Sequence, residues 1–320
     1  MKHTAWIAAI SAVVAILLMT WGLWPESGAR EPVRPIIALV LDKDIGVNSA
    51  VIGEGAQIAA REMKAELSVV SPSESAGVDR QIDLVQEQLE AGAAAVLLVP
   101  VQEEVVGAAA RLCQKYNARL VLLDVCEAYR GNVPYVGTDH LSSGIQGAET
   151  LFRIYGPEKF LVLYSEGQVS DERLKGVKLA AVRANVEAVE GQIPIVGALP
   201  CNVRVRALLA QNSDVTAVFC LDGALTECAA QEMAAMGCDQ RMTLAGFDCD
   251  QTHISCLEDG SVRFTVLREP LAVGYKGLKC AMDLLSWDEV QPIEYVDTAV
   301  VMCGDVMKPE NIQLVFPLIR

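Results

Sequence analysis

Short apolar runs alternate with longer amphipathic segments along nearly the whole chain after residue 35. The apolar runs suit buried strands, and the segments between them repeat apolar positions at helical spacing. This alternation predicts repeated strand-helix-strand units and a parallel sheet. The expected strands are residues 36–41, 67–70, 94–99, 120–123, 160–163, 193–198, 217–221, 243–245 and 264–267, and a tail that contains residues 299–302 closes the chain.

The pattern restarts after residue 137, so that the chain has two halves of similar organisation. The same periodicity predicts helices at residues 50–64, 79–91, 141–154 and 171–189. No linker rich in Gly, Pro or Ser separates the halves, which predicts lobes joined by crossing strands with a boundary near Asp139. The expected fold class is therefore α/β, with doubly wound parallel sheets in two joined lobes.

An uncharged segment at residues 4–25 precedes this pattern. About 20 apolar residues in a helix span the roughly 30 Å hydrocarbon core of a bilayer, so the segment is expected to be an export signal or a retained anchor. Lys2 precedes it, which places the N-terminus in the cytoplasm and the following chain outside. Residues 27–29 (Ser-Gly-Ala) suit a cleavage site, but the apolar run is longer than a usual signal core, which favours the anchor. We predict a signal or anchor plus linker over residues 1–34 and an extracytoplasmic working domain.

Charge and composition argue against several classes of function. The formal net charge is −15 and the pI is about 4.7, so neither nucleic acid nor an anionic lipid surface is an expected partner. The ten cysteines include no CxxC pair and the chain has only three histidines, so no metal site is expected. We expect most cysteines to be buried thiols, with at most one or two disulfides.

Motifs of the common enzyme classes are missing from the sequence. A GxGxxG turn after the first strand, a GxxxxGK[ST] phosphate loop and a GxSxG nucleophile elbow are all absent. Three scattered histidines leave little for acid-base catalysis. We therefore expect a binding protein without a cofactor rather than an enzyme.

Acidic residues gather just past the expected strand ends. Sheets of this kind bind ligands beyond the carboxyl ends of their strands, where helix N-termini add partial positive charge. Carboxylates accept hydrogen bonds from hydroxyl or ammonium groups and arginines donate planar pairs of them, which predicts a site for a small polar molecule. Asp139 and Asp222 are expected instead to cap the helices that follow them, and His140 is expected at the surface. The other residues at these ends are Asp42, Lys43, Asp44, Asp124, Phe247, Asp248, Cys249, Arg268 and Glu269.

A series of segments resembles the type 1 periplasmic binding proteins of the ribose-binding and LacI-like sugar-binding group. The resemblance covers roughly residues 35–302 and implies two Rossmann-like lobes, joined by three crossover segments, that close on a small molecule. It assigns residues 35–138 and 269–296 to an N-terminal lobe and residues 139–268 and 297–320 to a C-terminal lobe. The segments are DRQIDLVQEQLEAGAAAVLLVPV (79–101), VLLD (121–124), YVGTDHLSSGIQGAE (135–149), ERLKG (172–176), AVFCLDG (217–223), LAGFD (244–248) and LEDGSVRFTVLREP (257–270).

The resemblance also implies where the ligand is held. Asp124 matches the family's aspartate after the fourth strand, Arg173 its cleft arginine and Asp248 the aspartate of its GFD motif. Other positions differ, because Asn48 stands in place of an aromatic residue, Leu221 of an asparagine and Arg268 of a glutamine. Loss of aromatic stacking removes a main source of sugar affinity, so a sugar-like molecule, a polyol and an amine remain open. The ligand-binding residues we expect are Asp42, Asp44, Asn48, Asp124, Arg173, Leu221, Asp248 and Arg268.

Two kinds of membrane partner are compatible with such a receptor. An ABC permease would make the protein an import component, whereas a membrane sensor such as a histidine kinase would make it a signalling co-receptor. A DNA-binding repressor built on the same core would need a basic helix-turn-helix where the apolar segment stands. The sequence leaves the choice between permease and sensor open.

Overall fold

The computed structural model describes residues 34–42, 47–73, 77–124, 131–194, 199–248 and 251–316. The chain divides into a unit of Met1–Pro35 and a compact unit of Ile36–Arg320, and the second unit is described below. Among the helices in these ranges, none combines the length and the apolar character needed to cross a bilayer. The predicted signal or anchor at residues 4–25 lies outside the described residues, as does Asp44.

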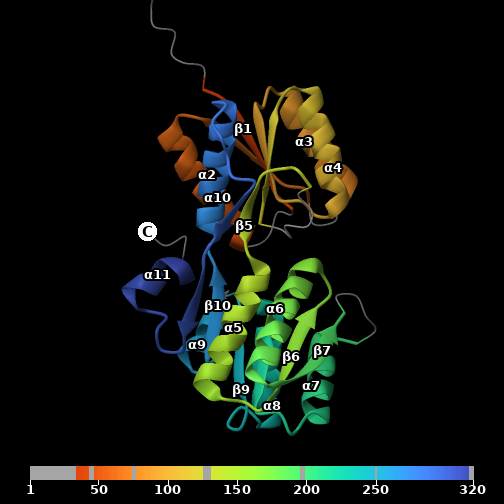
Figure 1. Cartoon of the computed structure of the whole chain (residues 1–320), viewed down its shortest axis with the longest axis vertical. Helices are drawn as coiled ribbons and strands as arrows, with labels where there is room; N and C mark the ends of the chain where they lie inside the picture. Colours follow the sequence, from red (N-terminus) through yellow and green to blue (C-terminus); the bar gives the residue numbers. More distant parts are fainter. Residues whose placement is uncertain are drawn as a thin grey trace, which may run out of the picture. The chain divides into compact units, whose positions relative to one another are not determined.

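Two sheets form the centre of this unit (Figure 1). The first sheet has the strand order β2-β1-β3-β4-β5-β11, and every neighbouring pair is parallel. Its strands are β1 (Ile36–Val40), β2 (Glu66–Val70), β3 (Ala95–Leu98), β4 (Arg119–Leu123), β5 (Tyr135–Thr138) and β11 (Ile293–Val296).

The second sheet repeats this arrangement, with the strand order β7-β6-β8-β9-β10-β12. Its pairs are parallel except β12, which runs antiparallel to β10. Its strands are β6 (Lys159–Ser165), β7 (Glu187–Ile193), β8 (Ala217–Cys220), β9 (Thr243–Phe247), β10 (Phe264–Arg268) and β12 (Thr298–Met302).

The chain passes between the sheets at three places, after β5, after β10 and between β11 and β12. The polypeptide therefore builds two lobes that share no strand, each from discontinuous parts of the sequence. The predicted α/β fold with two lobes and mainly parallel sheets is confirmed.

Helices cover both faces of each sheet. The first sheet packs against α2 and α10 on one face and against α3 and α4 on the other. The second packs against α5 and α6 on one face and against α7, α8, α9 and α11 on the other. The helices are α2 (Val47–Met63), α3 (Val78–Glu90), α4 (Glu103–Lys115), α5 (His140–Tyr155), α6 (Gln168–Ala184), α7 (Cys201–Gln211), α8 (Gly223–Met236), α9 (Gln251–Glu258), α10 (Pro270–Leu285) and α11 (Pro309–Val315).

Alternate residues of the central strands enter opposite cores. In β3, Leu97 packs with α2 and α10 whereas Leu98 packs with α3 and α4, and both side chains are fully buried. Successive side chains of a strand point to opposite faces, so a strand covered on both sides must be apolar throughout. This explains why the strands appear in the sequence as continuous apolar runs.

One stretch of the second lobe differs from the prediction. The helix predicted at residues 171–189 is confirmed up to Ala184 and wrong beyond it, because α6 ends there and β7 begins at Glu187. Of the strand predicted at residues 193–198, Ile193 is the last residue of β7, and residues 195–198 lie outside the described residues. Asn185 adopts a left-handed conformation, with φ of 55°, and its N–H bonds to the carbonyls of Ala181 and Val182. An asparagine accepts this conformation more readily than most residues, so it ends the helix and frees the next segment to pair with β6.

The cysteines that the structure describes are thiols at buried or half-buried positions. Burial raises the pKa of Cys113 to about 12 and that of Cys280 to about 11, which makes both poor nucleophiles. Cys201 on α7 and Cys228 on α8 lie in contact, with 3.0 Å between their sulfur atoms. This pair is a candidate for one of the expected disulfides, which remain a prediction.

Candidate functional site

Asp124 and Asp248 occupy equivalent places at the ends of β4 and β9. Both adopt left-handed backbone conformations, with φ of 48° and 58°. The N–H of Asp124 bonds to the carbonyl of Val136 at 3.1 Å, and that of Asp248 bonds to the carbonyl of Val266 at 2.9 Å. Counted from β2 and from β7, β4 and β9 are each the fourth strand of their sheet. The internal repeat therefore places one carboxylate at the same point of each lobe.

Arg268 connects these two carboxylates. It is the last residue of β10, where the chain leaves the second sheet for the first. Its Nη1 lies 3.0 Å from Oδ2 of Asp124, and its Nε donates to Oδ1 of Asp248 at 2.7 Å. The side chains of Asp124 and Arg268 are only 7% and 13% exposed, so this link is largely protected from water.

Arg173 completes the charged cluster from the second turn of α6. Its Nη1 donates to the carbonyl of Leu221 at 2.6 Å and lies 3.4 Å from Oδ2 of Asp248. Its guanidinium stacks over the ring of Phe247 at 4.2 Å from the centroid. The side chain is 2% exposed, and this stacking and pairing explain how a cation is tolerated there.

Close packing of α5 against α6 fixes the position of Arg173. A Cβ added to Gly144 of α5 would overlap the carbonyl oxygen of Arg173, and one added to Gly176 of α6 would overlap that of Leu141. Two glycines therefore let the two backbones touch. This brings the N-terminal part of α5 next to the charged cluster.

The two aspartates respond differently to this environment. Burial would raise the pKa of Asp248, but the charges of Arg268 and Arg173 outweigh burial and hold it below its usual range. Burial raises the pKa of Asp124, and Arg268 offsets that effect only in part. Asp248 is thus the firmly ionised member of the pair.

Several buried polar atoms around the cluster lack hydrogen-bond partners among the described residues. Native proteins satisfy roughly 90% or more of such groups, so a local group of exceptions needs an explanation. A small polar molecule with donors and acceptors is one explanation that chemistry allows. The atoms are Oδ1 of Asp124, Oγ1 of Thr138, Nδ1 and Nε2 of His140, and Nε and Nη2 of Arg173.

Comparison with known families shows to which family the chain belongs. The model of the periplasmic binding protein domain matches residues 42–289, which is most of the sequence. The chain belongs to the periplasmic binding protein family, type 1.

Two curated relatives illustrate the family. The chain is 21% identical to the ribose import binding protein RbsB of Haemophilus influenzae over 306 residues, covering 91% of this chain and 98% of the relative. It is 27% identical to the D-allose-binding periplasmic protein of Escherichia coli over 172 residues. That second match covers 51% of this chain and 55% of the relative.

Solved structures share the fold. GanP, a glucose-galactose binding protein from Geobacillus stearothermophilus, is 20% identical with a TM-score of 0.76, covering 86% of this chain and 99% of that one. The structure titled XylFII-LytSN complex is also 20% identical, with a TM-score of 0.70, covering 86% of this chain and 100% of that one. At these identities the likeness concerns the fold.

The structure brings four of the predicted site residues of this family member into one cluster: Asp124, Arg173, Asp248 and Arg268. Asp42 stands nearby, since its charge contributes to raising the pKa of Asp124, and it accepts a hydrogen bond from Ser49 at 3.2 Å.

The remaining predicted residues stand apart from the ion pairs. Asn48 is half-buried on α2. The side chain of Leu221 is fully buried in the apolar core, so this residue meets the cluster through its carbonyl, which holds Arg173. Its proposed role is therefore to position the arginine.

Two caps at strand ends are as predicted, and one neighbouring residue is not. Asp139 accepts from the N–H of Ser142 at 2.9 Å, and Asp222 accepts from that of Leu225 at 2.8 Å. His140, expected at the surface, is buried with 4% exposure, because the packing of α5 against α6 covers the first turn. Thr138 was not predicted as a site residue and is also buried. Thr138 ends β5 and His140 begins α5, and their position on either side of the capping Asp139 was the available signal.

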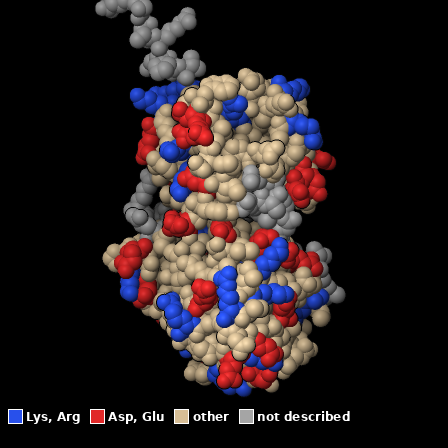
Figure 2. Space-filling view, in the orientation of Figure 1, with Lys and Arg blue, Asp and Glu red and all other residues tan. Residues whose placement is uncertain are grey.

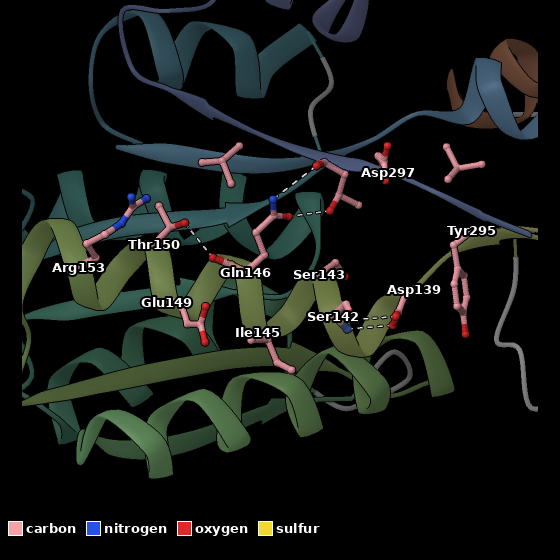
Figure 3. A pocket seen from close by; sticks show the side chains of 13 residues that line it. Asp139, Ser142, Ser143, Ile145, Gln146, Glu149, Thr150, Arg153, Tyr295 and Asp297 are labelled. Carbon is pink, nitrogen blue, oxygen red and sulfur yellow. Dashed lines mark hydrogen bonds between the residues drawn. The ribbon is translucent and has the colours of Figure 1, made fainter.

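A separate open groove of about 990 Å³ lies between α5 and residues 295–300, which span the end of β11 and the start of β12 (Figure 3). Gln146 of α5 is tied across it to Thr298, whose Oγ1 donates to Oε1 of Gln146 at 2.7 Å. Asp139, Glu149 and Asp297 also line the groove. The charged cluster does not line it, so the groove and the cluster are distinct features.

The arrangement of potential metal ligands and the surface charge are two further features of the described residues. Within the described ranges, no group of three or more His, Cys, Asp or Glu side chains is placed to hold a metal ion. On the face drawn in Figure 2, acidic and basic side chains are interspersed between wide uncharged areas. That face has no continuous basic patch of the kind that binds nucleic acid.

Proposed function

We propose that this protein is an extracytoplasmic solute-binding protein whose lobes close on a small polar molecule beside the Asp124–Arg268–Asp248 link. The observation that carries the proposal is the set of unpaired buried polar atoms around this link. A hydroxyl-bearing ligand would supply the missing partners, which pays part of the cost of desolvating them. Opening of the lobes would break the Arg268–Asp124 contact and admit the ligand.

The charge balance of the cluster favours an uncharged ligand. Two carboxylates face two guanidinium groups, and each carboxylate already has an arginine partner. A sugar-like molecule or polyol fits such a site, since each hydroxyl both donates and accepts. An amine would find its counter-charge at Asp42, which forms no ion pair with any described residue. The names of the relatives, which concern ribose and D-allose, agree with a neutral ligand.

We favour delivery of the bound ligand to an ABC permease. The curated relatives include ribose import binding proteins, and a solved neighbour is titled as an ABC transporter solute binding protein. The alternative is a ligand-sensing co-receptor for a histidine kinase or another membrane sensor. The neighbour solved as the XylFII-LytSN complex supports it, since that member of the fold binds another protein.

The apolar segment at residues 4–25 would retain the protein at the outer face of the cell membrane. A periplasmic or secreted protein would result if the segment were cleaved. Sequencing the N-terminus of the mature protein distinguishes the two, because cleavage removes Met1 and the apolar run.

A thermal-shift screen of the full chain tests the proposal. A ligand that binds only the folded state raises the melting temperature. We expect a shift with at least one neutral compound among D-ribose, D-allose, D-arabinose and myo-inositol, and none with putrescine. If putrescine gives the shift and Asp42→Asn abolishes it, the neutral ligand class is wrong. If every probe leaves the melting temperature unchanged, the assignment as a receptor for such solutes fails.

A further inference from the structure

We propose that His140 is a ligand-contacting residue that helps to set the specificity of this receptor. The inference rests on the proposed function and adds a residue that the sequence analysis had placed at the surface. Its side chain is 4% exposed, and neither ring nitrogen has a hydrogen-bond partner among the described residues. A histidine with both nitrogens buried and unpaired loses the hydration of two polar atoms without compensation.

The backbone around His140 is held firmly. It is the first residue of α5, directly after the capping Asp139, and its carbonyl accepts from Oγ of Ser143 at 2.9 Å. Four residues further on, Gly144 lets α5 touch the backbone of Arg173 on α6. The imidazole is therefore presented from a rigid helix start beside the cluster, which is where precise recognition requires it.

Burial and the charges that face His140 keep the imidazole neutral. Burial is the main cause of a pKa lowered to about 2, and the positive charges of Arg173 and Arg268 lower it further. Asp248 acts in the opposite direction and is outweighed. A neutral imidazole has one N–H donor and one acceptor nitrogen.

This pair of groups matches a hydroxyl, which donates and accepts as well. An ammonium group would use only the acceptor nitrogen and would bring a third positive charge next to two arginines. The ligand chemistry that His140 selects is therefore a neutral hydroxyl-bearing molecule. Thr138, whose Oγ1 is also unpaired, lies two residues away and would add a second contact of the same kind.

The test compares the variants His140→Leu and His140→Gln with the wild-type chain by thermal shift, alone and with D-allose or D-ribose. Leucine removes the unpaired atoms, so we expect the ligand-free protein to melt about 2 °C higher. The same variant should bind the sugar at least tenfold more weakly. Glutamine keeps a donor and an acceptor and should recover part of the affinity. Thr150→Val is the matched control, since Thr150 is a buried polar residue of α5 with its own partner, the carbonyl of Gln146.

A variant that melts at a higher temperature without ligand but binds the sugar more weakly indicates that the replaced residue has a binding role. If His140→Leu lowers the melting temperature of the ligand-free protein, His140 is a structural residue and the inference is overturned. If the wild type responds to a sugar, Asp124→Asn abolishes the response and His140→Leu preserves it, the receptor stands and only this inference fails. If the wild type responds to none of the sugars, both proposals fall together.

Discussion

Arg268 stands in the second sheet at the position that Thr138 holds in the first. Each residue lies two places beyond the valine whose carbonyl accepts from a strand-end aspartate, Val266 in one case and Val136 in the other. The repeat therefore places a short hydroxyl in one lobe and a long guanidinium in the other. Because the guanidinium reaches the aspartates of both lobes, one side chain turns a repeated architecture into a single charged cluster.

Arg268→Gln removes the charge that pairs with both aspartates. Two largely buried carboxylates then lose a partner, and we expect a loss of about 3 kcal/mol in the free energy of unfolding. The melting temperature should fall by roughly 6 °C. Arg80→Gln is the control, because Arg80 pairs with Glu87 and the two side chains are 45% and 53% exposed, so that this pair should matter little. Equal effects of the two variants would show that the cluster gives no special stabilisation.

Asp248→Asn should be more destabilising than Asp124→Asn at pH 7. The pKa of Asp248 is lowered, so its charged form is favoured in the folded protein, whereas the pKa of Asp124 is raised by burial. We expect the difference between the two losses to be about 2 kcal/mol in urea unfolding. An equal or reversed order would contradict the assignment of Asp248 as the firmly ionised carboxylate.

Gly144→Ala should shift the position of Arg173. The new Cβ would meet the carbonyl oxygen of Arg173 on the neighbouring helix, and the backbones must separate to accommodate it. We expect a destabilisation of about 3 kcal/mol together with weaker ligand binding.

Gly53→Ala provides the matched control for this change. Gly53 lies inside α2 and has no atom near the added Cβ, so alanine there should be neutral or stabilise by up to about 1 kcal/mol. A harmless Gly144→Ala would mean that the close approach of α5 and α6 is not needed.

His140 should make the fold sensitive to mild acid. Its pKa is about 2 in the folded protein, against about 6.5 when unfolded, so between these values the unfolded chain binds one more proton. Stability therefore falls as the pH drops below about 6.5. Relative to the wild type, His140→Leu should lose less stability between pH 7 and pH 5, by up to about 2 kcal/mol. Identical pH dependence in the two proteins would show that His140 is not held neutral.

The central strands were predictable from the sequence because strands covered on both faces must be apolar along their whole length. The edge strands β7 and β11, which carry exposed residues, were not predicted. The helix at residues 171–189 was predicted too long because apolar residues continue past Ala184 into β7. What ends that helix is the conformation of Asn185, and an asparagine inside an amphipathic pattern gives only a weak stop signal.

The site was predictable only in part. Residues at strand ends identified the charged cluster, since carboxyl ends of parallel strands meet at one edge of a sheet. The burial of His140 was not predictable, because it depends on the contact between α5 and α6 that Gly144 and Gly176 permit. The contacts of Arg268 with aspartates of both lobes likewise depend on the tertiary structure rather than on the local sequence.

The central claim is that a neutral solute binds between the strand-end aspartates of the two lobes. Calorimetric titration of the full chain with D-ribose or D-allose tests it most directly, using the wild type, Asp124→Ala and Asp248→Ala, with folding checked by melting. The account predicts saturable binding of one molecule per chain in the wild type and none in either variant. Two folded variants that bind the sugar as tightly as the wild type would contradict it.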